Sequence, residues 1–261
     1  ELSTHSVLDI FDQTGKKGTF FILGSVARRC PDLVREIQRR GHEIASHGYG
    51  HQIAYLQNKR QFFRDVRRTK CLLEDLTGQA VVGYRAPNFS ITERNPWAHE
   101  ELRRAGYRYD SSVYPIWHPR YANLATSLTP YLINTNQGPL VEIPLAVRRE
   151  KFMGFTLRIP VAGGAYWRLF PPVLIELGLR RIRSEEKRPA CCYLHPWEVD
   201  IGQPKLPGIG SITWFRHFGG TTSLARRLQV YLARFGSVSI HDMMQLHYPE
   251  LWDVLADSAG H

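Results

Sequence analysis

The 261-residue sequence predicts an α/β fold in which parallel strands form a barrel-like arrangement. Short apolar runs alternate along the chain with longer amphipathic stretches, which is the pattern of parallel strands joined by crossover helices. Neither a Gly-x-Gly-x-x-Gly motif nor a P-loop follows any of these runs, so the usual support for an open nucleotide-binding sheet is missing. Roughly seven strands therefore favour a distorted (β/α)7 TIM-like barrel over an open doubly wound sheet.

The first half of the chain shows the alternation most clearly. Glycines bound the apolar run at 18–24, and between residues 26 and 40 apolar side chains recur at helical spacing until Gly41 ends the helix. The same reasoning assigns the rest of this half. Strands are expected at residues 18–24, 42–47, 81–84 and 107–110, and helices at 7–13, 26–40, 58–76 and 96–105.

The second half is less regular. Six prolines between residues 115 and 165 interrupt short apolar runs, which indicates an irregular insertion or a hairpin. The elements expected here are strand-like runs at 140–147, 155–161, 190–194 and 237–240 and helices at 171–187 and 223–235.

The domain organisation follows from this pattern, because neither an internal repeat nor a linker divides the chain. We predict a single domain over residues 1–261. Its barrel motifs lie in about 1–115 and 188–245, and an irregular insertion plus a helix occupies 116–187. No apolar run approaches the ~18 residues of a membrane span, so we expect no transmembrane segment. The first residues show no signal-peptide pattern, and the bacterial cytoplasm and the cell envelope both stay open as compartments.

The chain is basic, with 34 Lys and Arg against 24 Asp and Glu and a net charge of +10. An anionic partner is one interpretation, because arginines are frequent in the helices expected at 26–40, 59–70 and 180–188. The alternative is that these charges form the solvated faces of outer helices. We favour the second interpretation, because the charges are spread over several helices and no recognised nucleic-acid module accompanies them.

Polar side chains follow several of the expected strands. In a barrel the chemistry lies at the carboxyl ends of the strands, so these positions are the candidate site. His47 and His51 follow the strand at 42–47, and imidazoles at this spacing can share a divalent metal if the segment turns helically. The alternative is a loop histidine that makes one hydrogen bond.

Three further strand ends carry candidates. Arg85 precedes a proline turn that either presents backbone N–H groups for an oxyanion hole or belongs to a structural ion pair. Asp110 either orients a catalytic base or caps a turn. His195 lies between an apolar run and a Pro-Trp pair, where it is suited to acid–base work if a carboxylate such as Asp110 sets its tautomer. The alternative for His195 is a packed residue.

Taken in order, these segments resemble the NodB-type polysaccharide deacetylases, carbohydrate esterase family 4, over nearly the whole chain. The segments that carry the resemblance are Thr19-Phe20-Phe21-Ile22-Leu23-Gly24, Gly41-His42-Glu43-Ile44-Ala45-Ser46-His47 with His51, Arg85-Ala86-Pro87, Asp110-Ser111-Ser112-Val113-Tyr114 and Leu194-His195-Pro196. Residues 85–92, 160–164 and 194–198 also resemble the branch of the family associated with bacterial exosortase and exopolysaccharide loci.

The resemblance implies metal-dependent hydrolysis of N-acetyl groups, with zinc as the expected metal. His47 and His51 are implied to be two zinc ligands, where the metal polarises the acetamide carbonyl and lowers the pKa of the attacking water. Arg85 is implied to pair with and tune the catalytic base. The base and a third metal ligand are expected from an acidic pair that ends the family's opening strand.

The resemblance also assigns roles around the substrate. The backbone N–H near Asn88 helps to hold the tetrahedral oxyanion, and Leu194 walls the acetyl methyl group. His195 protonates the leaving amine, and Asp110 orients His195. The other residues implied on the substrate side are Tyr114 and Trp197.

The acidic pair itself does not occur ahead of the Thr19–Gly24 strand. Asp9 and Asp12 lie on the expected first helix rather than at a strand end, and neither fits the motif. We therefore expect that the sequence starts just after the strand that carries the pair.

Three functions are compatible with these patterns. The favoured one is an N-deacetylase acting on an N-acetylhexosamine-containing polysaccharide in bacterial exopolysaccharide or cell-envelope metabolism. The second is a catalytically inactive glycan-binding relative, whose groove is lined by Tyr49, Trp117, Trp197 and Trp214. The third is a basic protein that binds nucleic acid or an anionic surface. We do not favour this third function, so we expect no nucleic-acid partner.

Overall fold

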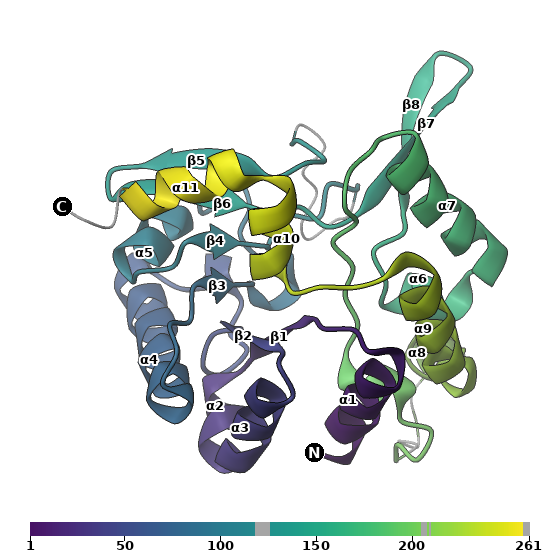
Figure 1. The fold of residues 1–261 in the computed structure, drawn as a ribbon, viewed down its shortest axis with the longest axis horizontal. Coiled ribbons are helices and arrows are strands. Elements are labelled where there is room, and N and C mark those ends of the chain that lie inside the picture. Colours follow the sequence, from purple (N-terminus) through teal and green to yellow (C-terminus); the bar gives the residue numbers. More distant parts are fainter. Residues whose placement is uncertain (118–125, 205–207, 209, 258–261) are drawn as a thin grey trace. The chain divides into compact units, whose positions relative to one another are not determined.

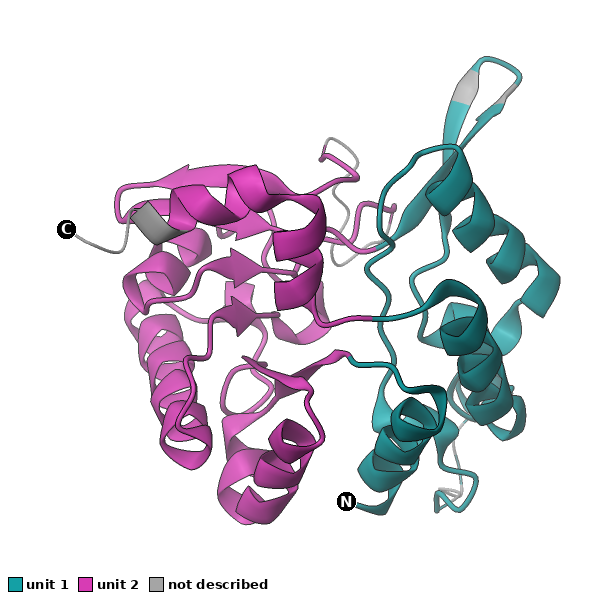
Figure 2. Cartoon of the chain, viewed as in Figure 1, with its two compact units in different colours: residues 1–17, 146–237 teal, residues 18–145, 238–261 magenta. Residues whose placement is uncertain are grey.

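The structure is a computed structural model, and it describes all residues except 118–125, 205–207, 209 and 258–261. Its contacts group the chain into two compact units (Figure 2). Unit 1 comprises residues 1–17 and 146–237, and unit 2 comprises residues 18–145 and 238–261. Each unit is assembled from segments that are far apart in the sequence. The single domain expected from the sequence stays a prediction.

A six-stranded mixed sheet forms the centre of unit 2 (Figure 1). Strands β1 to β4 and β6 run parallel in the order β1-β2-β3-β4-β6, and β5 pairs with β6 in the antiparallel direction. The strands are β1 (Thr19–Ile22), β2 (Glu43–Ser46), β3 (Gly83–Tyr84), β4 (Tyr109–Asp110), β5 (Tyr131–Thr135) and β6 (Gly138–Glu142). The predicted parallel α/β fold is confirmed, although the described residues form an open sheet rather than a closed barrel.

The helices of unit 2 follow the predicted pattern with one break. They are α2 (Gly24–Arg29), α3 (Pro31–Arg39), α4 (Lys59–Thr77), α5 (Trp97–Arg104), α10 (Ile240–His247) and α11 (Pro249–Asp257). The helix expected at 26–40 is two helices, because Pro31 begins α3 and restricts the backbone of Cys30 before it. In α4, the Asn58 side chain accepts a hydrogen bond from the Gln61 N–H, which satisfies an otherwise unpaired donor of the first turn.

The largest fully buried side chains of unit 2 are aromatic. Phe62 of α4 packs edge-on against Tyr84, whose ring lies 5.5 Å from that of Tyr107. Tyr109 is fully buried beside Gly83, where a Cβ atom would lie 2.1 Å from its ring. Glycine is therefore required at this point of β3 for the two strands to pair.

Unit 1 contains a β-hairpin and five helices within the described residues. The elements are α1 (Leu2–Thr14), β7 (Val147–Phe152), β8 (Phe155–Pro160), α6 (Ala165–Leu169), α7 (Pro172–Ser184), α8 (Ser211–Phe218) and α9 (Thr221–Phe235). The antiparallel β7–β8 pair confirms the hairpin, one of the two alternatives expected for residues 115–165. Among the parts of the chain that the structure describes, no helix is long and apolar enough to cross a membrane.

Two predicted strands are wrong. The segment 190–194 forms an isolated bridge between Gly163 and Tyr193 instead of a strand, because its backbone hydrogen bonds reach two separate segments, at Ala146 and at 162–164. The segment 237–240 leads into a helix instead of forming a strand. The Ser239 hydroxyl accepts a hydrogen bond from the Asp242 N–H, and this capping starts α10 at Ile240.

Candidate active site

The carboxyl ends of β2, β3 and β4 bring several predicted residues to one edge of the sheet. Ser46 pairs with Tyr84, and Tyr84 pairs with Asp110, so these strands end at the same level. His47 and Arg85 directly follow the first two of these strand ends. Five of the predicted residues therefore belong to one edge of unit 2, and they are His47, His51, Arg85, Asn88 and Asp110.

The two histidines predicted to bind metal lie side by side. The ring centroids of His47 and His51 are 5.3 Å apart, and the rings meet at 70°. His47 donates its Nδ1 proton to the carbonyl oxygen of Arg85 across 2.7 Å, which leaves Nε2 as its metal-binding atom. His51 is exposed, with a left-handed backbone at φ 57°. Two adjacent imidazoles, one already fixed in its tautomer, fit a divalent metal such as zinc.

Arg85 is buried and fixed by the neighbouring strand end. Its Nε donates to the carbonyl oxygen of Ser111 at 2.9 Å, and its Nη2 donates to the Ser111 hydroxyl at 2.7 Å. The guanidinium also lies over the Phe21 ring, 4.2 Å from the centroid. A permanent positive charge is thus held at the end of β3, next to the end of β2 that carries His47.

The turn after Arg85 has an unusual backbone. Asn88 and Phe89 both adopt left-handed conformations, with φ angles of 54° and 53°. The Phe89 and Ser90 N–H groups are bonded within the turn, but the Asn88 N–H makes no hydrogen bond to any described residue. Asn88 is also exposed. A strained turn that presents an unpaired N–H is suited to binding an oxyanion.

Asp110 lies in a buried cluster that the sequence did not indicate. One of its oxygens accepts a 2.5 Å hydrogen bond from Ser112, and the other lies 3.6 Å from His99 Nε2. Glu142, fully buried at the end of β6, accepts from the Val113 N–H at 2.9 Å and lies beside Asp110. Together, ligand atoms of His99, Asp110 and Glu142 lie within 4.8 Å of one another, close enough to hold a metal ion.

Electrostatics favour a shared proton in this cluster. Burial raises the pKa of Asp110 to about 7, although hydrogen bonds from Ser112 and Glu142 oppose the shift. Burial, and then the charge of Asp110, raise the pKa of Glu142 well above its ordinary value. Burial also lowers the pKa of His99 to about 4, so this imidazole is neutral. The two carboxyl groups therefore share a proton near neutral pH.

The remaining predicted residues lie in different surroundings. Tyr114 is buried in unit 2, with its ring 5.6 Å from that of Phe89. Leu194, His195 and Trp197 belong to unit 1, in the segment that ends in the short 3₁₀ helix Pro196–Val199. Leu194 and Trp197 are half-buried, and His195 is exposed.

Glu198 is the functional candidate that sequence reasoning missed. Its Oε2 accepts the His195 backbone N–H at 2.8 Å and lies 3.4 Å from His195 Nδ1. Its Oε1 accepts from Arg168 Nε at 2.8 Å. The three-residue spacing between His195 and Glu198, typical of a capping box, could have indicated the first contact, whereas nothing near Arg168 points to the second.

The four aromatic residues expected to line a glycan groove belong to two units, Tyr49 and Trp117 to unit 2 and Trp197 and Trp214 to unit 1. The guanidinium of Arg68 covers the Tyr49 ring at 3.7 Å, and His217 stacks on Trp197 at 4.4 Å and 6°. Trp117 is 72% exposed and Trp214 is 40% exposed. Two of the four predicted side chains therefore present open rings.

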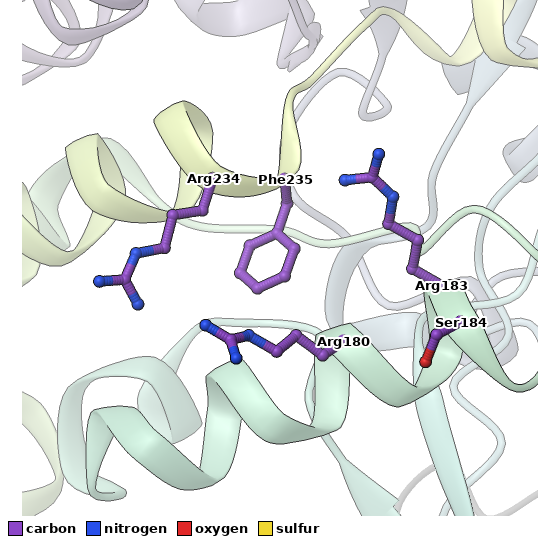
Figure 3. A pocket seen from close by; sticks show the side chains of 5 residues that line it. All are labelled: Arg180, Arg183, Ser184, Arg234 and Phe235. Atoms are coloured by element: carbon purple, nitrogen blue, oxygen red, sulfur yellow. The ribbon is translucent and has the colours of Figure 1, made fainter.

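A separate pocket of unit 1 gathers positive charge (Figure 3). Arg180, Arg183 and Ser184 line it from α7, and Arg234 and Phe235 line it from the end of α9. Arg180 and Arg183 are exposed, and Arg234 forms an ion pair with a neighbouring glutamate, Glu176. None of the predicted site residues lines this pocket.

Comparisons with known proteins agree with the fold. A solved structure from Mycobacterium smegmatis, assigned to the polysaccharide deacetylases, superimposes with a TM-score of 0.59 and 23% identity, covering 98% of this chain and 77% of that one. A family 4 carbohydrate esterase from Streptomyces lividans gives a TM-score of 0.51 and 17% identity, covering 91% of this chain and 84% of that one. Both likenesses define the NodB-like α/β fold.

Sequence comparisons identify the class and then the family. Residues 1–109 match the polysaccharide deacetylase family model. A peptidoglycan-N-acetylglucosamine deacetylase of Bacillus cereus is 33% identical over 99 residues, which are 38% of this chain and 36% of that relative. The match spans little more than a third of the relative's length. Residues 1–109 are thus similar in sequence to the polysaccharide deacetylases, and the chain shares their fold. The chain belongs to the family described as "Domain of unknown function (DUF3473)", whose model matches residues 111–245, more than half of its length.

Proposed function

We propose that this protein is a metal-dependent hydrolase that removes N-acetyl groups from an N-acetylhexosamine-containing polysaccharide. The observation that carries the proposal is the pairing of His47 with His51 at the strand edge, with the Nδ1 proton of His47 fixed by the Arg85 carbonyl. The match of residues 1–109 to the polysaccharide deacetylases supports the same reaction. Zinc is the metal we expect, because two imidazoles suit it.

The ligand set needs a third member. Within the described residues, no further His, Cys, Asp or Glu groups with His47 and His51 in a set of three. The family resemblance gives the third ligand and the catalytic base to an acidic pair, and neither Asp9 nor Asp12, which lie on α1, fits that motif.

The chemistry divides between the metal and the residues of the chain. When bound, the metal polarises the acetamide carbonyl and lowers the pKa of the attacking water. The Asn88 N–H donates to the carbonyl oxygen as it gains negative charge, and the buried charge of Arg85 tunes the base. Water adds to the carbonyl carbon, the carbon–nitrogen bond breaks, and acetate and an amine are released.

Other residues act on the leaving group and the substrate. His195 protonates the amine nitrogen as the carbon–nitrogen bond breaks, and Leu194 contacts the acetyl methyl group. Tyr114 and Trp197 are the further residues that we expect to contact the substrate, as the family resemblance implies. Asp110 is the partner that the family resemblance gives to His195.

The substrate is assigned to bacterial exopolysaccharide or cell-envelope metabolism. Residues 85–92, 160–164 and 194–198 support this, because they resemble the exosortase-locus branch of the family. The Bacillus cereus relative is named a peptidoglycan-N-acetylglucosamine deacetylase, and this name supports an N-acetylhexosamine-containing polysaccharide as the substrate.

The test is acetate release from oligomers of N-acetylglucosamine by the full-length zinc-loaded protein. We expect release by the wild type and none by His195→Ala, with the zinc content of the variant unchanged. Loss of zinc from His195→Ala would show that the metal site is misplaced. Binding of the oligomer without acetate release or stoichiometric zinc would instead identify a glycan-binding relative.

A further inference from the structure

The side chain of Glu198 is enclosed in unit 1 and bound at both oxygens. Its side chain is 1% exposed, and that of its partner Arg168 is 2% exposed. A buried carboxylate that is held by a buried arginine keeps its charge, because each ion compensates the other. Burial alone would raise the pKa of Glu198, but hydrogen bonds from His195 and Arg168 lower it below the ordinary value. Glu198 is therefore ionised at neutral pH.

Arg168 cannot turn away from Glu198 without breaking several bonds. Its Nη1 donates to the carbonyl oxygens of His217 and Gly219 at 3.0 and 2.7 Å, and its Nη2 donates to that of Arg216 at 3.0 Å. These carbonyls belong to the end of α8 and the turn after it. The end of that helix thus fixes the arginine, and the arginine fixes the carboxylate.

The same carboxylate fixes both the main chain and the ring of His195. Oε2 accepts the backbone N–H at 2.8 Å and lies 3.4 Å from Nδ1. Because a carboxylate can only accept, this contact selects the form of the ring that carries a proton on Nδ1. The His195 side chain is 52% exposed, while that of Glu198 is buried, so the ring is supported on one side and accessible on the other.

Ring stacking adds a second restraint. The planes of His195 and Trp197 meet at 22° with centroids 5.8 Å apart, and Trp197 in turn stacks on His217. The charged or titratable groups that contact His195 or the adjacent Trp197 in the described part of unit 1 include Glu198, Arg168 over the Trp197 ring, His217 and the Tyr193 ring at 5.7 Å. Of these, only Glu198 carries a negative charge that stabilises a protonated imidazole.

Asp110 is a poor candidate for this task. Its carboxylate belongs to unit 2, where one oxygen accepts from the Ser112 hydroxyl and the other lies 3.6 Å from His99 Nε2. Each oxygen of Asp110 therefore already has a neighbour within unit 2, whereas Glu198 contacts His195 directly.

We propose that Glu198, held by Arg168, is the positioning residue that orients His195 and stabilises its protonated form during amine release. This inference rests on the proposed deacetylase function and names the carboxylate that serves it. The reaction consumes the Nε2 proton of His195 when the carbon–nitrogen bond breaks, and Glu198 keeps the Nδ1 proton in place throughout.

The experiment compares Glu198→Gln with Glu198→Asp and with Asp110→Asn in the full-length protein. NMR follows the titration of the His195 ring, whose signals are identified by their loss in His195→Asn. We expect the midpoint to fall by on the order of one pH unit in Glu198→Gln and by less in Glu198→Asp, which keeps the charge at a shorter reach. We expect Asp110→Asn to leave the midpoint in place.

Kinetics provide the second readout. In Glu198→Gln, kcat for acetate release should fall about 10- to 100-fold with KM little changed, and the basic limb of its pH profile should move to lower pH. An unmoved midpoint in folded Glu198→Gln overturns the proposal, as does a shift caused by Asp110→Asn alone. If Glu198→Gln does not fold, an unmoved midpoint in Glu198→Asp does the same. A wild type that releases no acetate but shows the expected shifts overturns the proposed function and keeps the His195–Glu198 pairing.

Discussion

The imidazole of His47 donates its Nδ1 proton to the carbonyl oxygen of Arg85 across 2.7 Å. This bond joins the end of β2 to the end of β3, so the direction in which one predicted zinc ligand points depends on the turn that carries the predicted oxyanion donor. A second interaction ties that turn to the next strand, because the Ala86 N–H donates to the Ser112 hydroxyl at 2.8 Å. The predicted zinc ligand and the predicted oxyanion donor therefore share one hydrogen-bonded framework.

The first prediction concerns metal content. Both His47→Ala and His51→Ala should reduce bound zinc in the full-length protein at least 10-fold at limiting zinc, because each removes one imidazole ligand. The measurement is the zinc-to-protein ratio after dialysis against a weak chelator. His247→Ala is the matched control, since His247 is exposed on α10 and lies outside the proposed site. Equal zinc content in all three variants would show that the pair does not bind the metal.

The second prediction separates the backbone of Asn88 from its side chain. Asn88→Gly should keep acetate release within about twofold and should not reduce stability, because glycine adopts φ 54° without strain and still presents the N–H. Asn88→Ala should lower the free energy of unfolding by about 1 kcal/mol, because alanine is strained there. Urea unfolding and initial rates measure the two effects. A large loss of kcat in folded Asn88→Gly would assign the function to the amide side chain.

The third prediction is a pH dependence of stability caused by the Asp110–Glu142 pair. Burial raises the pKa of Asp110 to about 7, so the folded state holds a proton that the unfolded state has already released above about pH 4. Stability from this pair is therefore present at low pH and is lost as the pH rises toward 7. We expect the free energy of unfolding to fall by about 1–3 kcal/mol between pH 5 and pH 8 through this pair.

Glu142→Gln is the matched variant for the pair. Its amide can donate to Asp110 and allow that carboxylate to ionise, so the pH dependence should flatten and the variant should exceed the wild type in stability at pH 8. Urea unfolding at both pH values, with and without EDTA, makes the comparison. A metal ion bound by His99, Asp110 and Glu142 would give the opposite result, because stability would then rise with pH and fall on chelation.

The sequence predicted the parts of the fold that depend on local signals. The glycine-bounded run that became β1 and the Asn58 cap of α4 are readable within a few residues. The α8 helix was not predicted, because the segment before it is rich in Gly and Pro and favours a loop, and none of the helix's own residues is buried. Residues 237–240 alternate polar and apolar side chains as a strand does, but the Ser239 hydroxyl caps a helix that begins at Ile240.

The candidate site was predictable at its strand ends and not beyond them. His47, Arg85 and Asp110 each follow an apolar run, and parallel strands necessarily bring their carboxyl ends to one edge. The partners of site residues come from far along the chain. Glu142 lies beside Asp110, and Arg168 binds Glu198. No spacing in the sequence reports such contacts, because they depend on how the strands and helices pack.

The last prediction tests the packing of β3 against β4. In Gly83→Ala the new Cβ would lie 2.1 Å from the Tyr109 ring, and both residues are buried, so neither can move into solvent. We expect a loss of about 3 kcal/mol or more in the free energy of unfolding. Replacing the ring removes the clash, so the cost of Gly83→Ala should be smaller in a Tyr109→Leu background by about 1–3 kcal/mol.

Gly50→Ala is the control, because no atom lies within 4 Å of its added Cβ, and its stability should stay within about 0.5 kcal/mol of the wild type. Additive costs in the double variant would show that the Tyr109 ring does not set the requirement for glycine at position 83.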